Sequence, residues 1–129
     1  MIRRILVVDD ETGFTKLLKM NLEKTEQYEV RVENDSTKAL NAAHEFLPDV
    51  VLLDIVMPGM DGGDVAAQMQ DDPLLQSIPV VMMTALVSQE ETSQDAVAQA
   101  GAMNILPKPV NLEVLLRCLE EVLAKGSGS

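Results

Sequence analysis

The feature that most constrains this chain is a regular alternation between short apolar runs and longer amphipathic segments. Five runs rich in Val, Ile, Leu and Met are typical of strands, and they occupy residues 5–10, 28–33, 50–54, 79–85 and 103–107. Helical periodicity follows each run, at about 12–24, 36–46, 62–70, 90–100 and from 111 onward. Strict alternation of strands and helices favours right-handed crossovers and a parallel sheet covered on both faces. The sequence therefore predicts a (βα)5 doubly wound α/β fold with a five-stranded parallel sheet.

Two of the expected strands differ from the others in composition. The run at 28–33 alternates apolar and charged residues, and the run at 103–107 contains a proline that cannot donate to a strand ladder. Both are therefore expected at the edges of the sheet. Among the helices, Ser36 is expected to cap the second and Asn111 the fifth, while Leu17 and Leu47 are expected on buried faces.

Composition narrows the class of protein. A chain of 129 residues with 47% hydrophobic content suits one domain, expected over residues 1–125, and the Gly-Ser repeat at 126–129 is expected to be a flexible linker or an engineered tail. The net charge of −11 disfavours direct binding to nucleic acid or to an anionic membrane. A single cysteine, and the absence of a signal peptide or a spanning segment, indicate a soluble cytoplasmic protein.

Polar side chains stand at the carboxyl ends of the expected strands, where open α/β sheets bind ligands. Asp9 and Asp10 follow the first strand, Asp54 ends the third, Thr84 ends the fourth and Lys108 follows the fifth. Converging carboxylates repel one another unless a proton or a cation intervenes, and an all-oxygen site suits Mg²⁺, with Mn²⁺ as a substitute. An ammonium and a hydroxyl beside such a site suit a further anion, such as a phosphoryl group.

Four motifs in order carry a resemblance to a known family: "VVDDE" at 7–11, "LLDIVMPGMDG" at 52–62, "MMTA" at 82–85 and "LPKP" at 106–109. From about residue 2 to residue 125 the chain resembles the receiver domain of bacterial two-component response regulators. The resemblance implies the flavodoxin-like (CheY-like) fold with strand order 2-1-3-4-5. It also implies a signalling domain whose only chemistry of its own is self-phosphorylation and self-dephosphorylation.

The same resemblance implies roles for particular residues. Asp54 would accept the phosphoryl group from a sensor histidine kinase or a phosphotransfer protein. Asp10, Asp54 and the backbone carbonyl of Val56 would ligate Mg²⁺, and Asp9 would assist through water. Partners would include a downstream effector or an output domain outside this chain, and the protein would be a monomer or a phosphorylation-dependent dimer.

Two further implications concern the end of the fifth strand. Thr84 and Lys108 would hold the phosphoryl oxygens, and the peptide bond between Lys108 and Pro109 would be cis. The chain departs from the family pattern at Ile105, where a switching Tyr or Phe is common, and an isoleucine cannot swing a ring inward behind Thr84. Thr84 and Lys108 are also 24 residues apart, about two more than the family pattern, and the excess is expected at 86–93.

The lifetime of an aspartyl phosphate depends on whether a water can be oriented for in-line attack. The positions two residues beyond Asp54 and Thr84 are best placed to orient it, and they hold Val56 and Leu86. Neither side chain can hydrogen-bond to water, whereas Asn, Gln or Glu could. We therefore expect slow self-dephosphorylation and a dependence on a partner to end the signal.

Each assignment has an alternative. Taken singly, Asp9 and Asp10 could interact with a helix N-terminus, Asp54 could be a turn residue, and Lys108 could be a solvated cation. A receiver-like module that is never phosphorylated is one alternative for the whole chain. A Mg²⁺-dependent phosphohydrolase with an aspartyl nucleophile is another, although it would need an acid where this chain has Val56. A flavodoxin-like cofactor binder would present Ser, Thr and Gly in the first loop, where this chain presents Asp-Asp-Glu.

Overall fold

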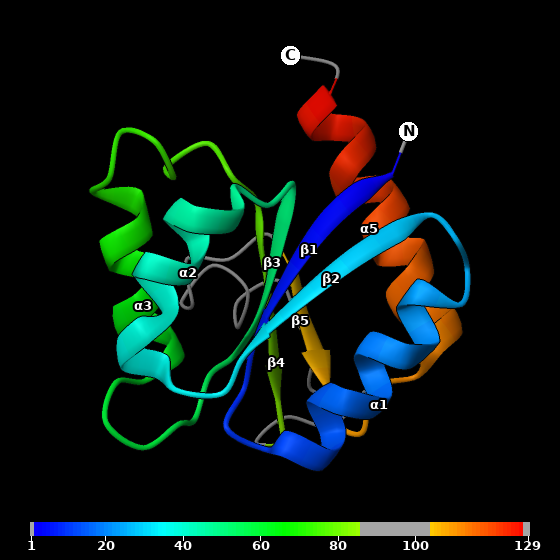
Figure 1. Cartoon of the computed structure of the whole chain (residues 1–129), viewed down its shortest axis with the longest axis horizontal. Helices are drawn as coiled ribbons and strands as arrows, with labels where there is room; N and C mark the ends of the chain where they lie inside the picture. The colour runs from blue at the N-terminus through cyan, green and yellow to red at the C-terminus, as the bar shows by residue number, and fades with distance from the viewer. Residues whose placement is uncertain (1, 86–103, 128–129) are drawn as a thin grey trace.

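The computed structural model describes residues 2–85 and 104–127, which build a single parallel sheet with helices on both sides (Figure 1). The strands are β1 (Arg3–Val8), β2 (Tyr28–Glu33), β3 (Val50–Asp54), β4 (Val80–Thr84) and β5 (Asn104–Pro107). Their order is β2-β1-β3-β4-β5, which confirms the predicted order 2-1-3-4-5 and places the two predicted edge strands at the edges. The fold is therefore the expected flavodoxin-like α/β fold.

Four helices and one short 3₁₀ turn are described. They are α1 (Thr12–Glu23), η1 (Ser36–Lys38), α2 (Ala39–Phe46), α3 (Gly62–Gln70) and α5 (Leu112–Ser127). In Figure 1, α1 and α5 cover one face of the sheet, and α2 and α3 cover the other. The predicted helix at 90–100 lies outside the described residues. Of the helices that are described, none has the length and apolarity that a membrane span requires.

The central strands β1, β3 and β4 are buried on both faces because their alternate side chains enter two separate cores. In β1, Ile5 and Val7 pack into the core beneath α1 and α5, whereas Leu6 and Val8 pack into the core beneath α2 and α3. All residues of β3 and β4 are buried. Each fully buried aliphatic side chain contributes roughly 1.5–3 kcal/mol relative to exposure. This packing fixes the carboxyl ends of β1, β3 and β4 beside one another.

Local expectations at the helices were confirmed in part. Asn111 does cap α5, since its Oδ1 accepts the Val114 N–H at 3.2 Å. The expected cap at Ser36 is wrong, because Asp35 accepts the Thr37 N–H and a 3₁₀ turn precedes α2.

The expected buried positions of two leucines are also wrong. The side chain of Leu47 is 54% exposed because the residue ends α2 in a left-handed conformation, φ +49°, and so leaves the helical stripe. Leu17 is 55% exposed, and α1 buries the neighbouring stripe of Thr15, Leu18 and Leu22 instead.

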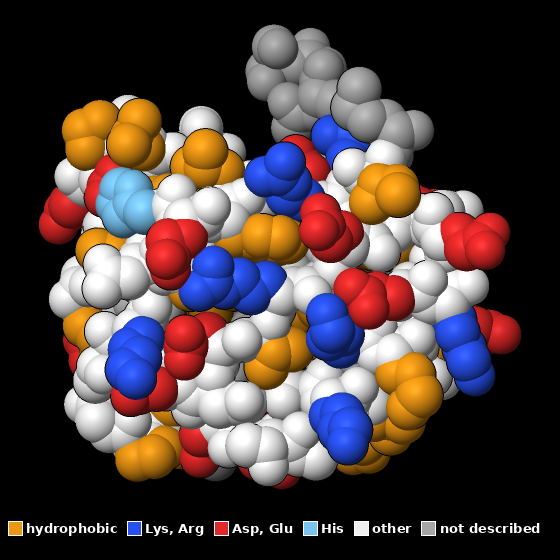
Figure 2. Space-filling model, in the orientation of Figure 1, with side chains coloured by type: hydrophobic (Ala, Val, Ile, Leu, Met, Phe, Trp, Pro, Cys, Tyr) orange, Lys and Arg blue, Asp and Glu red, His pale blue; other side chains and the backbone are white. Residues whose placement is uncertain are grey.

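Acidic and basic side chains are interspersed on the face seen in Figure 2, and the blue side chains do not gather there into one basic patch. The exposed ion pairs Lys19–Glu23 and Arg31–Glu45 have N–O distances of 3.2 and 3.0 Å. Exposed pairs of this kind contribute about 0–1 kcal/mol each. That the chain does not bind nucleic acid directly stays a prediction.

Candidate functional site

The ends of the strands bring the predicted polar residues to one edge of the sheet. Asp9 follows β1, Asp54 is the last residue of β3 and Thr84 is the last residue of β4, and all three are buried. Lys108 follows β5, and its backbone N–H donates to the Thr84 carbonyl at 2.9 Å. Asp10 is exposed at the start of the β1–α1 connection. Among the described residues, those predicted for the site therefore converge.

Lys108 is the cationic centre of this arrangement. Its Nζ lies 2.9 Å from Asp9 Oδ2, 2.5 Å from Glu11 Oε1 and 3.7 Å from Asp54 Oδ2. The ammonium also lies 4.6 Å from the centroid of the Phe14 ring, within the range of a cation–π contact. Burial by itself would lower the pKa of Lys108, but hydrogen bonds to Glu11 and Asp9 outweigh it and raise the pKa above its ordinary value. The lysine is therefore a fixed positive charge.

Asp54 is a buried carboxylate in a mostly acidic environment. Burial, with a further contribution from the Asp9 charge, raises its pKa to about 6, while Lys108 and the Val56 N–H oppose the shift. The Val56 N–H donates to Asp54 Oδ1 over a long 3.4 Å contact. At neutral pH this carboxyl is mainly ionised, yet it is more basic than an ordinary aspartate. Such a group is a better nucleophile than a surface carboxylate.

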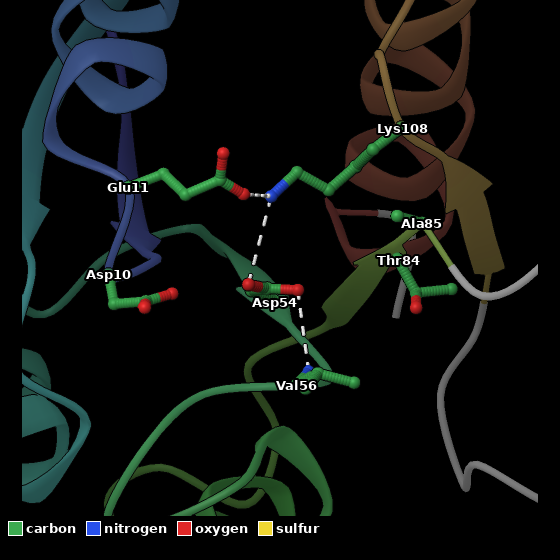
Figure 3. A pocket seen from close by; sticks show the side chains of 7 residues that line it. All are labelled: Asp10, Glu11, Asp54, Val56, Thr84, Ala85 and Lys108. Atoms are coloured by element: carbon green, nitrogen blue, oxygen red, sulfur yellow. Dashed lines mark hydrogen bonds and ion pairs between the residues drawn. The ribbon is translucent and has the colours of Figure 1, made fainter.

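The side chains surround an open cavity of about 370 Å³ (Figure 3). It is lined by Asp10, Glu11, Asp54, Val56, Thr84, Ala85 and Lys108. Val56, one of the two positions expected to control dephosphorylation, is 56% exposed at this cavity, whereas Leu86 lies outside the described residues. Ile105 is buried in the core beneath α2 and α3. The Lys108–Pro109 peptide bond is cis, the form that the resemblance implies.

The donor set fits a hard divalent cation. Carboxylate oxygens of Asp9, Glu11 and Asp54 all lie within 4.8 Å of one another, and Asp10 lines the same cavity. Oxygen ligands with an open, solvent-facing side suit Mg²⁺, which retains several waters. The acidic cluster is therefore compatible with the predicted metal.

Sequence reasoning missed one residue of the site, Glu11. Its carboxylate is both a member of the acidic cluster and the nearest partner of Lys108. The sequence offers one signal for it, since Glu11 is the third acid of "VVDDE", but this pattern alone indicates only an acidic loop. The sequence carries no local signal for the contact with Lys108, because Lys108 is 97 residues away along the chain.

The loop after β3 is held close to Asp54 by backbone and side-chain contacts. Ser36 Oγ donates to the Pro58 carbonyl at 3.1 Å and accepts the Met60 N–H at 3.2 Å. The Gly62 N–H donates to the Ile55 carbonyl at 2.8 Å. These contacts tie the loop to η1 and to the segment directly after β3.

The sequence matches the family model described as "Response regulator receiver domain" over residues 5–120. It is 43% identical over 111 residues to "Response regulator PleD" of Caulobacter vibrioides, covering 86% of this chain and 24% of that protein. It is 40% identical over 122 residues to "Protein PilH" of Pseudomonas aeruginosa, covering 94% of this chain and 98% of that protein. The chain thus spans about a quarter of the length of PleD and nearly all of PilH.

Solved structures agree with these relatives. The "response regulator receiver domain protein (CheY-like)" of Methanospirillum hungatei JF-1 superimposes with a TM-score of 0.84 at 29% identity, covering 99% of this chain and 98% of that chain. Other relatives of similar sequence are named as DNA-binding regulators, and the chain covers about half of their length or less.

Proposed function

The chain belongs to the response regulator receiver domain family, whose members are phosphoacceptor signalling domains of two-component systems, and from this we propose that Asp54 is its phosphoacceptor. The donor would be a phosphohistidine on a sensor histidine kinase or a phosphotransfer protein. The observation that carries the proposal is the position of Asp54. It is a buried carboxylate at the end of β3 that lines the cavity, beside the Asp9 carboxylate and 3.7 Å from the Lys108 ammonium.

The proposed transfer is an in-line displacement at phosphorus. A bond forms between a carboxylate oxygen of Asp54 and the phosphorus atom, while the bond from phosphorus to the donor imidazole nitrogen breaks and leaves its electron pair on that nitrogen. Lys108 and Thr84 would hold the oxygens of the transferred group. Lys108 is suited to this because its ammonium is already within 3.7 Å of Asp54 and its side chain is only 9% exposed.

A divalent cation would complete the charge balance. We propose that Asp10, Asp54 and the Val56 carbonyl hold Mg²⁺, with Asp9 acting through water, and that Mn²⁺ can substitute. When bound, the ion supplies positive charge next to the transferred phosphoryl oxygens. Two observations support this assignment: Asp9 and Asp54 belong to the acidic cluster within 4.8 Å, where ionised carboxylates need a counter-charge, and Asp10 lines the same cavity.

The output of the domain would be a change in protein–protein interactions. Ile105 is buried and has no ring to rotate, so the proposed change would not use an aromatic switch at this position. The target would be an effector protein or an output domain of a longer chain, and the receiver would act as a monomer or as a phosphorylation-dependent dimer. We place the reaction in the cytoplasm, where the ATP that charges a histidine kinase is available.

Labelling with a small phosphodonor tests the proposal without knowledge of the kinase. Incubation with acetyl phosphate and Mg²⁺ should add the mass of one phosphoryl group to the intact protein, and Asp54→Asn should remove this labelling. Asp64→Asn, an exposed acid in the first turn of α3, serves as the matched control and should be labelled like the wild type. Undiminished labelling of Asp54→Asn would contradict the proposal.

A further inference from the structure

The Lys108 ammonium is shared among three carboxylates, and the phosphoacceptor is the most distant of them. Glu11 Oε1 and Asp9 Oδ2 accept hydrogen bonds from Nζ at 2.5 and 2.9 Å, whereas Asp54 Oδ2 is an ion-pair partner at 3.7 Å. Charge-assisted hydrogen bonds at the shorter distances are the stronger ones. The side chain expected to bind the phosphoryl group is therefore bonded elsewhere.

Glu11 and Asp9 hold the lysine in different ways. Asp9 is fully buried, and its second oxygen accepts the Glu11 N–H at 2.9 Å, so its carboxylate is fixed by the backbone. The Glu11 side chain is 60% exposed and reaches across the mouth of the cavity from the start of α1 (Figure 3). It can turn into solvent without burying an unpaired charge, whereas Asp9 cannot. Glu11 is therefore the partner of Lys108 that another anion can replace.

The Lys108 side chain has little room to move away from the site. Its side chain is 9% exposed, and the Phe14 ring lies against the ammonium at 4.6 Å. A phosphoryl group on Asp54 would place anionic oxygens in the cavity that both Glu11 and Lys108 line. These oxygens would compete with the Glu11 carboxylate for the N–H donors of one ammonium, which has only three.

We propose that Glu11 is a positioning residue that restrains Lys108 in the unphosphorylated protein and releases it when Asp54 is phosphorylated. This inference rests on the proposed function and deepens it, because it assigns to the unphosphorylated state an interaction that the phosphorylated state loses. A contact present in only one of two states shifts their equilibrium by its own free energy. Removing Glu11 should therefore favour the phosphorylated form and its mimics.

Beryllofluoride, a phosphoryl mimic, measures that shift when it is titrated at saturating Mg²⁺ and followed by amide NMR. Glu11→Gln should bind beryllofluoride about two- to fivefold more tightly than the wild type, the range expected for a half-exposed charged pair. Glu11→Asp keeps the charge on a shorter side chain and should fall between the two. The control Glu113→Gln also removes one exposed negative charge, in the first turn of α5, and should bind like the wild type.

A second readout does not involve the phosphoryl mimic. In the unliganded protein, the Lys108 Nζ resonance should shift and its protons should exchange faster with water in Glu11→Gln, but not in Glu113→Gln. An unchanged Nζ resonance, or equal or weaker beryllofluoride binding by Glu11→Gln, would overturn the proposal while leaving the phosphoacceptor role intact. If neither the wild type nor any variant bound beryllofluoride, both the Glu11 proposal and the phosphoacceptor role of Asp54 would be overturned.

Discussion

Gly62→Ala tests how closely the loop after β3 is fitted against the phosphoacceptor. A Cβ atom added at Gly62 would lie 2.4 Å from the Asp54 carbonyl oxygen and 2.8 Å from Ile55 Cα, distances below the 3.0 Å that real Cβ atoms keep. Restoring that separation requires a movement of about 0.6 Å or more in the backbone that carries Asp54. Overpacking of this kind costs about 1–3 kcal/mol, and the helix propensity gained over glycine returns about 0.5–1 kcal/mol at most.

We expect a net loss of about 1 kcal/mol, or a decrease of about 3–5 °C in the melting temperature for a domain of this size. Urea and thermal denaturation followed by far-UV circular dichroism measure the loss, and labelling by acetyl phosphate should fall with it, because the Asp54 backbone is displaced. Gly13→Ala is the matched control, since its added Cβ meets nothing within 4 Å. If Gly62→Ala were as stable and as readily labelled as Gly13→Ala, the close approach at Gly62 would not be real.

Three further predictions concern charge and signal lifetime. Burial and the neighbouring Asp9 charge raise the pKa of Asp54 to about 6. Between the ordinary pKa of aspartate and about 6, the native state therefore holds a proton that the unfolded state has lost. Protonation of Asp54 favours the native state, and this stabilisation is lost as the pH rises through about 6. Without Mg²⁺, Asp54→Asn should therefore melt higher than the wild type at pH 7.5 and by a smaller margin at pH 5, and equal margins would contradict this. Hydrogen bonds from the Leu74 N–H and His44 lower the pKa of Asp72, so its ionised form stabilises the native state. Asp72→Asn should therefore lower the free energy of unfolding at pH 7. The difference from the wild type should shrink in denaturation series below the ordinary pKa of aspartate. Once the donor is removed, Val56→Asn should lose its acyl phosphate faster than the wild type, because an amide can orient water where Val56 cannot, and equal decay would refute the idea.

The sheet could be predicted because buried strands leave a direct record in the sequence. The runs at 28–33 and 50–54 match β2 and β3 at both ends, and the proline of 103–107 correctly marked an edge strand. Periodicity alone did not supply the strand order, which came from the resemblance. Helix faces were less reliable, since Leu17 and Leu47 point to solvent. A leucine at a helix end leaves the stripe when the backbone turns left-handed, and no local pattern records that turn.

The site could be predicted where its residues end a strand or closely follow one. Asp9 and Asp54 were found because a carboxylate at the end of an apolar run needs a partner. Glu11 was missed because its partner, Lys108, is 97 residues away in the sequence and the glutamate itself is exposed. Likewise Ser36 was expected to cap a helix, but its hydroxyl bonds the loop at Pro58 instead. Such tertiary contacts depend on the assembled sheet rather than on the local sequence.

The most direct test of the central claim is to identify the atom that carries the phosphoryl group. Borohydride reduces an acyl phosphate to an alcohol, so protein labelled with acetyl phosphate and Mg²⁺, then reduced and digested, should contain homoserine in place of aspartate at position 54. Peptide mass spectrometry locates the change, and the account predicts it at Asp54 alone. Homoserine at Asp9 or Asp10, or a stable phosphate on Ser, Thr or His with Asp54 unmodified, would contradict the account.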